Sequence, residues 1–171
     1  MARKRIPVIS VVGHSNSGKT TFLERLIPAL QRRGCRVATL KHDVHDFEMD
    51  REGKDSYRHK KAGAVVSMVA SPRKLGLVAD LDEELTVGQI VSRYVRDVDL
   101  VITEGYKREE WPKIEVFRTD QGMKPACESD PQLVAIVSDT WVEAAVPVFL
   151  RDDPEAVAEF IVAGFIGNGA V

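Results

Sequence analysis

Gly13-His14-Ser15-Asn16-Ser17-Gly18-Lys19-Thr20 is the stretch that decides the fold, because it has the G-x-x-x-x-G-K-T pattern of a phosphate-binding loop. Residues 6–12 before it form an apolar run that predicts a buried strand, and residues 19–33 after it carry apolar side chains at helical spacing. Consecutive N–H groups of such a loop surround phosphate oxygens, and the helix that follows adds the positive end of its dipole. The sequence therefore predicts a nucleotide site between a strand and a helix.

The residue types in this loop have separate expected roles. Gly13 and Gly18 allow backbone angles and close approaches that a side chain would prevent. Lys19 is expected to contact the β- and γ-phosphates, and the Thr20 hydroxyl is expected to bind Mg²⁺. The expected nucleotide-binding residues are Gly13, His14, Ser15, Asn16, Ser17, Gly18, Lys19, Thr20 and Thr21.

Length, charge and hydropathy limit the classes of protein that fit. The chain has 171 residues, so we expect one domain over residues 1–171. No apolar run approaches the ~18 residues that span a bilayer, and no secretory signal is recognisable, which predicts a cytoplasmic protein away from membranes. The net charge of −2 indicates no nucleic-acid partner. Cys35 and Cys127 are expected to be buried free thiols.

Strand and helix patterns alternate along the chain, which predicts an α/β fold with a mostly parallel sheet and helices on both faces. With the phosphate loop, this is the three-layer sandwich of P-loop NTPases. Strands are expected at residues 6–12, 36–40, 65–69, 75–78, 98–103, 113–117, 134–137 and 146–149. Helices are expected at 19–33, where Pro28 should kink or interrupt the helix and Gly34 should end it, and at 55–62. Two more are expected at 86–95, beginning with a capping box of Thr86 and Gln89, and at 153–164, capped by Asp153, with a polar loop at 118–132.

Two acidic residues follow predicted strands, at the edge where ligands bind in open α/β sheets. Glu104 ends the strand at 98–103 and is a candidate for holding Mg²⁺ and orienting the hydrolytic water. Its alternative role is that of a solvent-exposed acid at a strand end. Asp43 follows the second strand and is a candidate catalytic residue, although a simple turn residue is an equally good interpretation.

Other charged residues near these strand ends have two interpretations each. His42 and His45 have a spacing found in metal sites, but a polar loop is the favoured interpretation. Lys107, Arg108 and Lys113 follow Glu104, where they either meet a phosphate-bearing ligand or form a solvated basic loop.

The choice of base is poorly encoded. The Asn/Thr-Lys-x-Asp sequence that reads guanine in many GTPases is absent. Asp139 follows the strand at 134–137 and is a candidate acceptor for a guanine edge, while a helix or turn cap is an equal alternative.

Four segments together resemble the MobB family of molybdopterin guanine dinucleotide biosynthesis: GHSNSGKTT at 13–21, residues 41–64, DLVITEGYK at 99–107 and VAIVSD at 134–139. The resemblance covers nearly the whole chain, and the segment at 41–64, which contains Gly53-Lys54-Asp55-Ser56, is its most specific part. It implies a SIMIBI-type P-loop fold, GTP binding with weak hydrolysis at most, and a homodimer. It also implies partnership with MobA, the guanylyltransferase that joins GMP to molybdopterin.

Two rival functions remain. A small-molecule or nucleoside kinase shares the phosphate loop but needs an acceptor pocket and usually an arginine-bearing lid, and the 118–132 stretch offers only Arg118 and Lys124. A scaffold whose nucleotide only sets its conformation is the other rival. The charge-dense segment at 41–64 is expected to bind a partner or the pterin, with His42, Lys54, Arg58 and Lys60 as candidates, or else to be a solvated surface.

Overall fold

The structure is a computed structural model that describes residues 5–43, 47–48 and 50–167. The chain divides into two compact units. The first runs to His42 and resumes at Val95, and the second is Asp43–Tyr94. The expected single domain over residues 1–171 stays a prediction, and each unit is described by itself.

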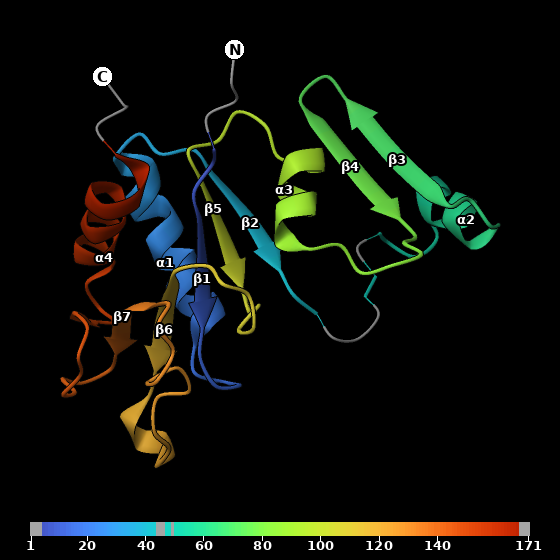
Figure 1. The fold of residues 1–171 in the computed structure, drawn as a ribbon. Helices are drawn as coiled ribbons and strands as arrows, with labels where there is room; N and C mark the ends of the chain where they lie inside the picture. Colours follow the sequence, from blue (N-terminus) through green and yellow to red (C-terminus); the bar gives the residue numbers. More distant parts are fainter. Residues whose placement is uncertain (1–4, 44–46, 49, 168–171) are drawn as a thin grey trace. The chain divides into compact units, whose positions relative to one another are not determined.

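Within the described residues, the first unit is built on a six-stranded sheet in which all neighbouring strands are parallel. The strands, in their order across the sheet, are β2 (Val37–Lys41), β5 (Leu100–Glu104), β1 (Val8–Val12), β6 (Lys113–Phe117), β7 (Leu133–Ser138) and β8 (Val148–Leu150) (Figure 1). Parallel strands place all their carboxyl ends at one edge, and ligands bind at that edge in open α/β sheets. The predicted α/β class with a mostly parallel sheet flanked by helices is confirmed.

The strand register aligns two parts of the predicted site, Glu104 and the start of the phosphate loop. Glu104, the last residue of β5, lies opposite Val11 on β1 and opposite Lys41 on β2. The phosphate loop begins directly after β1. Glu104 is therefore held at the same height of the sheet as the start of that loop.

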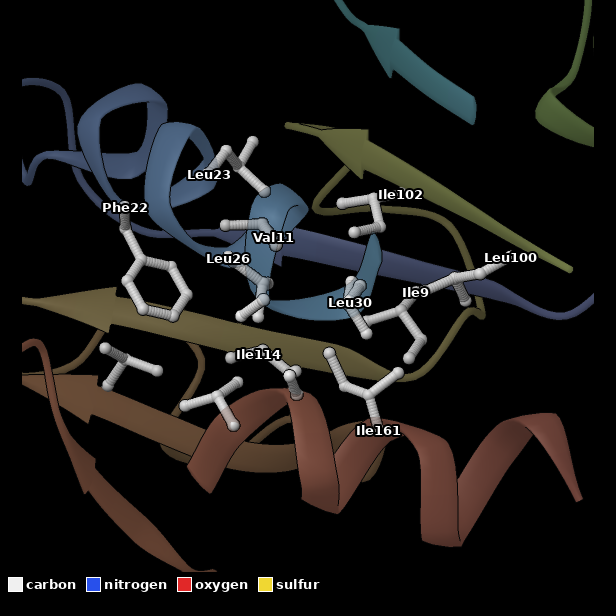
Figure 2. Packing of buried hydrophobic residues seen from close by; sticks show 14 of the residues in the cluster. Ile9, Val11, Phe22, Leu23, Leu26, Leu30, Leu100, Ile102, Ile114 and Ile161 are labelled. Atoms are coloured by element: carbon white, nitrogen blue, oxygen red, sulfur yellow. The ribbon is translucent and has the colours of Figure 1, made fainter. Parts of the chain in front are cut away.

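Two helices pack on one face of this sheet: α1 (Lys19–Arg32) and α4 (Pro154–Ile161), the latter continuing as a π-helical turn, Val162–Ile166. Phe22, Leu26 and Leu30 repeat every four residues along α1, and all three are fully buried. Figure 2 shows them packed with Ile161 of α4 and with Ile114 of β6. Each such side chain contributes about 1.5–3 kcal/mol when fully removed from water. This core fixes the start of α1 against the sheet, and with it the phosphate loop.

Helix α1 continues through Pro28, so the expected interruption is wrong. The apolar side chains of Leu26 and Leu30 are buried on either side of Pro28, and their packing outweighs the one missing backbone hydrogen bond. The helix ends as expected at Gly34, which has a φ of 78° and whose N–H donates to the carbonyl of Gln31.

The second unit contains α2 (Asp55–Lys61), β3 (Val66–Ser71), β4 (Lys74–Ala79) and α3 (Val87–Tyr94). Strands β3 and β4 form a separate antiparallel pair with Ser71 opposite Lys74. Helix α3 begins with the predicted capping box: the Gln89 N–H donates to Thr86 Oγ1 at 3.2 Å and the Thr86 N–H donates to Gln89 Oε1 at 2.9 Å. No helix among the described residues is long and apolar enough to span a bilayer.

Candidate functional site

The loop between β1 and α1 has a backbone that only glycine tolerates at its two ends. Gly13 has a φ of 143°, and a Cβ there would lie 2.3 Å from the carbonyl oxygen of Val116 on β6. Gly18 has a φ of 90° immediately before the first turn of α1. Lys19 Nζ folds back and donates to the carbonyl of His14 at 2.7 Å. The loop is therefore a tight cradle closed by its own lysine.

The chemistry of this cradle fits an anion. Ser17 is 1 % exposed, and its Oγ has no hydrogen-bond partner among the described residues. Burial lowers the pKa of Lys19, Glu104 opposes that shift, and the positive charges of Lys107 and Lys41 lower the pKa further. Three lysine ammonium groups therefore lie at this edge of the sheet, and the buried Ser17 hydroxyl has a hydrogen to donate. Triphosphate oxygens would satisfy both.

Thr20 and Glu104 meet at the same edge. Thr20 Oγ1, in the first turn of α1, donates a hydrogen bond of 2.8 Å to Glu104 Oε1 at the end of β5. A hydroxyl and a carboxylate are oxygen ligands of the kind that Mg²⁺ prefers, and the ion usually keeps several waters besides. The arrangement fits Thr20 as a direct ligand and Glu104 as a partner of the ion's water. Their metal role stays a prediction.

A pocket opens beside this pair, with a volume of about 190 Å³. It lies between α1, β2 and β5, and its lining is mostly apolar. The lining residues are Thr20, Leu23, Glu24, Ile27, Thr39, Leu40, Lys41, Ile102 and Glu104. Sites for drug-sized ligands usually measure about 300–1,000 Å³. The volume of this pocket lies below that range.

The histidine and aspartate candidates after β2 are only partly placed. The His42 N–H donates to the Glu104 carbonyl, and the His42 ring lies 4.6 Å from the ring of Tyr106. His45 falls outside the described residues, and no group of three or more His, Cys, Asp or Glu side chains suited to a metal occurs in the described ranges. Asp43 is the first residue of the second unit, so its catalytic role stays a prediction.

Asp139, the candidate reader of guanine, follows β7 at the same edge of the sheet. Its Oδ1 accepts from the Thr119 N–H at 3.0 Å and from the Thr119 hydroxyl at 3.3 Å. The Thr119 N–H is the main cause of the lowered pKa of Asp139. Asp139 thus caps the turn after β6, which was the structural alternative, and guanine recognition by this residue stays a prediction.

The basic residues after Glu104 do not act together. Lys113 is 2 % exposed, its Nζ lies 3.0 Å from Asp130 Oδ2, and it donates to the carbonyl of Glu109 at 2.7 Å. Both expectations for Lys113, phosphate contact and a solvated loop, are therefore wrong. Sequence spacing placed it on a strand but gave no sign of its buried acidic partner. Lys107 and Arg108 are exposed.

The sequence interpretation missed two contacts of the phosphate loop. His14 Nε2 is 3.0 Å from the carbonyl of Lys124, so the 118–132 loop touches the cradle. A guanidinium nitrogen of Arg151 lies 3.6 Å from the position that a Cβ would occupy at Gly18. Arg151 follows the last parallel strand, and the rule that singled out Glu104 at a strand end applies equally to it.

Comparisons with known proteins agree on one family. The family model described as Molybdopterin guanine dinucleotide synthesis protein B matches residues 8–139. The chain is 38% identical over 161 residues to the molybdopterin-guanine dinucleotide biosynthesis adapter protein of Escherichia coli K12, covering 92% of each. It is 32% identical over 171 residues to the probable adapter protein of the same name in Bacillus subtilis 168, covering 96% of each. The crystal structure of a molybdopterin-guanine biosynthesis protein B superposes with a TM-score of 0.73 at 36% identity, covering 91% of this chain and 96% of that one.

Proposed function

The chain belongs to the molybdopterin guanine dinucleotide synthesis protein B family, MobB, and from this premise we propose that it is a GTP-binding adapter that assists the guanylyltransferase MobA. Its role lies in molybdopterin guanine dinucleotide biosynthesis. We propose no enzymatic activity beyond weak GTP hydrolysis. The proposed compartment is the cytoplasm.

The observation that carries this proposal is the Thr20–Glu104 hydrogen bond beside the Gly13–Gly18 cradle. A phosphate loop with an acid at the end of the neighbouring strand is the arrangement by which P-loop proteins hold a nucleotide with Mg²⁺. When bound, Mg²⁺ supplies positive charge against the phosphates. Lys19 adds a second positive charge and holds the loop closed through the His14 carbonyl. Glu104 accepts a hydrogen bond from the Thr20 hydroxyl and would hold a water of the bound ion in place.

The preference for guanine rests on the family, with Asp139 as the candidate reader. Competition binding between GTP and ATP in the presence of Mg²⁺ tests it directly: GTP should displace ATP at equal concentration. An ATP preference would favour the kinase alternative. Measuring nucleoside diphosphate and free phosphate together, with and without small-molecule acceptors, separates the two classes further. With its acceptor a kinase forms diphosphate faster and transfers the phosphoryl group to the acceptor, whereas a hydrolase forms diphosphate and free phosphate in equal amounts at an unchanged rate.

A homodimer is the proposed assembly, and the strand pair β3–β4 supports it. An isolated two-stranded sheet is marginally stable in water. Six apolar side chains on and just before this pair are between 38% and 70% exposed: Val65, Val66, Met68, Val69, Leu75 and Leu77. By the strand register and the alternation of side chains, Val66, Met68, Leu75 and Leu77 share one face of the pair. An exposed apolar face of this kind marks an interface. Sedimentation of the parent chain should give twice the monomer mass, and Met68→Lys with Leu75→Lys should shift it to the monomer.

The partner surface that we propose for MobA or the pterin is the charged segment at 41–64. Lys54 and Arg58 are exposed at the start of α2, where Arg58 forms a 3.7 Å ion pair with Asp55. Lys60 differs, because its Nζ lies 2.5 Å from Asp80 Oδ2 and its side chain is 21% exposed. Among the three basic side chains named from the sequence, Lys54 and Arg58 are therefore more available to a partner than Lys60.

A further inference from the structure

Arg151 is fixed to the carboxyl edge of the main sheet by its own backbone. Its N–H donates to the carbonyl of Ser138, the last residue of β7, at 2.8 Å. Arg25 on α1 donates to the Arg151 carbonyl at 3.3 Å and forms an ion pair of 2.7 Å with Asp152. Bonds to β7 and to α1 thus pin the turn after β8. The side chain of Arg151 starts from a rigid position.

The Arg151 guanidinium lies directly against the phosphate loop. Its Nη1 is 3.6 Å from the position that a Cβ would take at Gly18, and its Nη2 donates to the carbonyl of Phe117, at the end of β6, at 3.3 Å. Its Nε is buried and has no hydrogen-bond partner among the described residues. The guanidinium has five donor hydrogens, and one weak bond to a carbonyl uses only one of them.

No carboxylate neutralises this cation in the part of the chain that the structure describes. The Asp120 carboxylate is bonded to Arg118, which is the main cause of its lowered pKa, and Arg151 lowers that pKa further. A partly buried charge without a partner is unfavourable unless a counter-charge arrives. The anion that arrives beside Gly18 in a P-loop protein is the phosphate chain of the nucleotide.

We propose that Arg151 donates to an inner phosphate of the nucleotide held by residues 13–20, on the side of β1 opposite to Thr20 and Glu104. The strand order supports the side: Glu104 ends β5 on one flank of β1, while Arg151 reaches Phe117 at the end of β6 on the other flank. Thr20 and Glu104, with the bound ion, would act at the terminal phosphate. Arg151 would donate to the α- or β-phosphate. The inference rests on the proposed nucleotide binding and makes Arg151 a phosphate-binding residue.

Calorimetry with GTP, GDP and ATP on Arg151→Ala tests this role. GTP and GDP should each bind about tenfold more weakly, about 1.4 kcal/mol, and ATP should lose the same factor because every one of these nucleotides has the inner phosphates. Arg151→Lys should recover part of the loss, since it restores the charge but not the planar fork. Arg36→Ala, at the amino end of β2 on the opposite edge of the sheet, is the matched control and should bind as the parent does.

The outcomes separate the inference from the proposed function. If the parent chain binds neither GTP nor ATP, nucleotide binding itself is refuted, and the role of Arg151 falls with it. If the parent binds and Arg151→Ala binds equally well with unchanged thermal stability, only the role of Arg151 is refuted. A loss confined to GTP, with ATP unaffected, would assign Arg151 to the guanine base and overturn the phosphate contact.

Discussion

Thr20 and Glu104 are 84 positions apart in the sequence, yet the hydroxyl of one donates a 2.8 Å hydrogen bond to the carboxylate of the other. The contact joins the first turn of α1 to the last residue of β5. Its geometry leaves the lone pairs of the Thr20 oxygen available to a cation while its proton points to Glu104. This relationship makes the edge of the sheet beside the phosphate loop a credible place for a metal-bound nucleotide.

Glu104→Gln should reduce Mg²⁺-dependent GTP hydrolysis by tenfold or more while changing GTP affinity by less than threefold. The amide keeps the shape of the side chain but removes the negative charge that orients the ion's water. Single-turnover hydrolysis and equilibrium binding measured on the same preparation check it. Glu159→Gln, an exposed change on α4, is the control and should behave as the parent does. Unchanged hydrolysis in Glu104→Gln would leave Glu104 as an ordinary strand-end acid.

Lys19→Ala should abolish detectable triphosphate binding and leave the fold intact. Lys19 Nζ donates to the loop carbonyls of His14 at 2.7 Å and Gly13 at 3.4 Å, and Lys19 is not among the buried core side chains of the described residues. Calorimetry with GTP measures the loss, and circular dichroism measures the fold. Lys74, at the start of β4, is also an exposed lysine, so Lys74→Ala is the matched control and should keep parental affinity. Equal affinities in Lys19→Ala and the parent would refute the phosphate-loop assignment.

Asp130→Asn should lower the free energy of unfolding by about 2 kcal/mol, because it leaves the buried Lys113 ammonium without its carboxylate. The hydrogen bond from the Gln132 N–H is the main cause that holds the pKa of Asp130 below its ordinary value, and Lys113 lowers this pKa further. A carboxyl group whose pKa is lowered by folding stabilises the folded state at pH values above its unfolded-state pKa. This stabilisation is lost as the pH falls through its folded-state pKa. Urea unfolding at neutral and at acid pH should therefore show the gap between parent and variant closing at acid pH. Glu128→Gln, exposed in the same loop, should show no gap at either pH.

Lys54→Ala with Arg58→Ala should leave GTP affinity within about threefold, roughly 0.7 kcal/mol. The same double change should weaken association with MobA or the pterin by tenfold or more, about 1.4 kcal/mol. Both side chains are exposed, and the 3.7 Å ion pair of Arg58 adds little to stability, so the fold should persist. Pull-down of MobA and a reconstituted cofactor-maturation assay measure the effect, with Arg73→Ala plus Lys74→Ala as the charge-matched control. Parental maturation rates in the double variant would make the segment a plain solvated surface.

Local patterns in the sequence predicted the local structure well. The capping box at Thr86 and Gln89, the helix end at Gly34 and the Asp153 cap of α4 each depend on residues within a few positions of one another, and all three are present. The phosphate loop between β1 and α1 is of the same kind, since its glycines and its flanks lie in one short stretch.

Long-range partners were beyond the reach of these patterns. Lys113 was expected near phosphate, but its side chain is buried and pairs with Asp130 from another segment. The strands at 65–69 and 75–78 were recognisable, yet hydropathy does not say which strands pair, and β3 and β4 pair only with each other among the described strands. Arg151 carries no motif, and only the strand order and the fold of α1 bring it to Gly18.

The strand order also has a consequence for how the chain acquires its structure during synthesis. The central strand β1 pairs with β5 and β6 and not with β2, so its buried hydroxyl contact from Ser10 to Thr103 spans 93 residues. A ribosome that has released only the first half of the chain has supplied β1 and β2 without the strand that lies between them. Over that interval the hairpin β3–β4, closed by residues next to one another, is the sheet that can form. Folding of the main sheet therefore waits for β5, and this high contact order makes it slow. Until then the apolar side chains of β1, which the finished sheet buries, stay exposed and prone to aggregation.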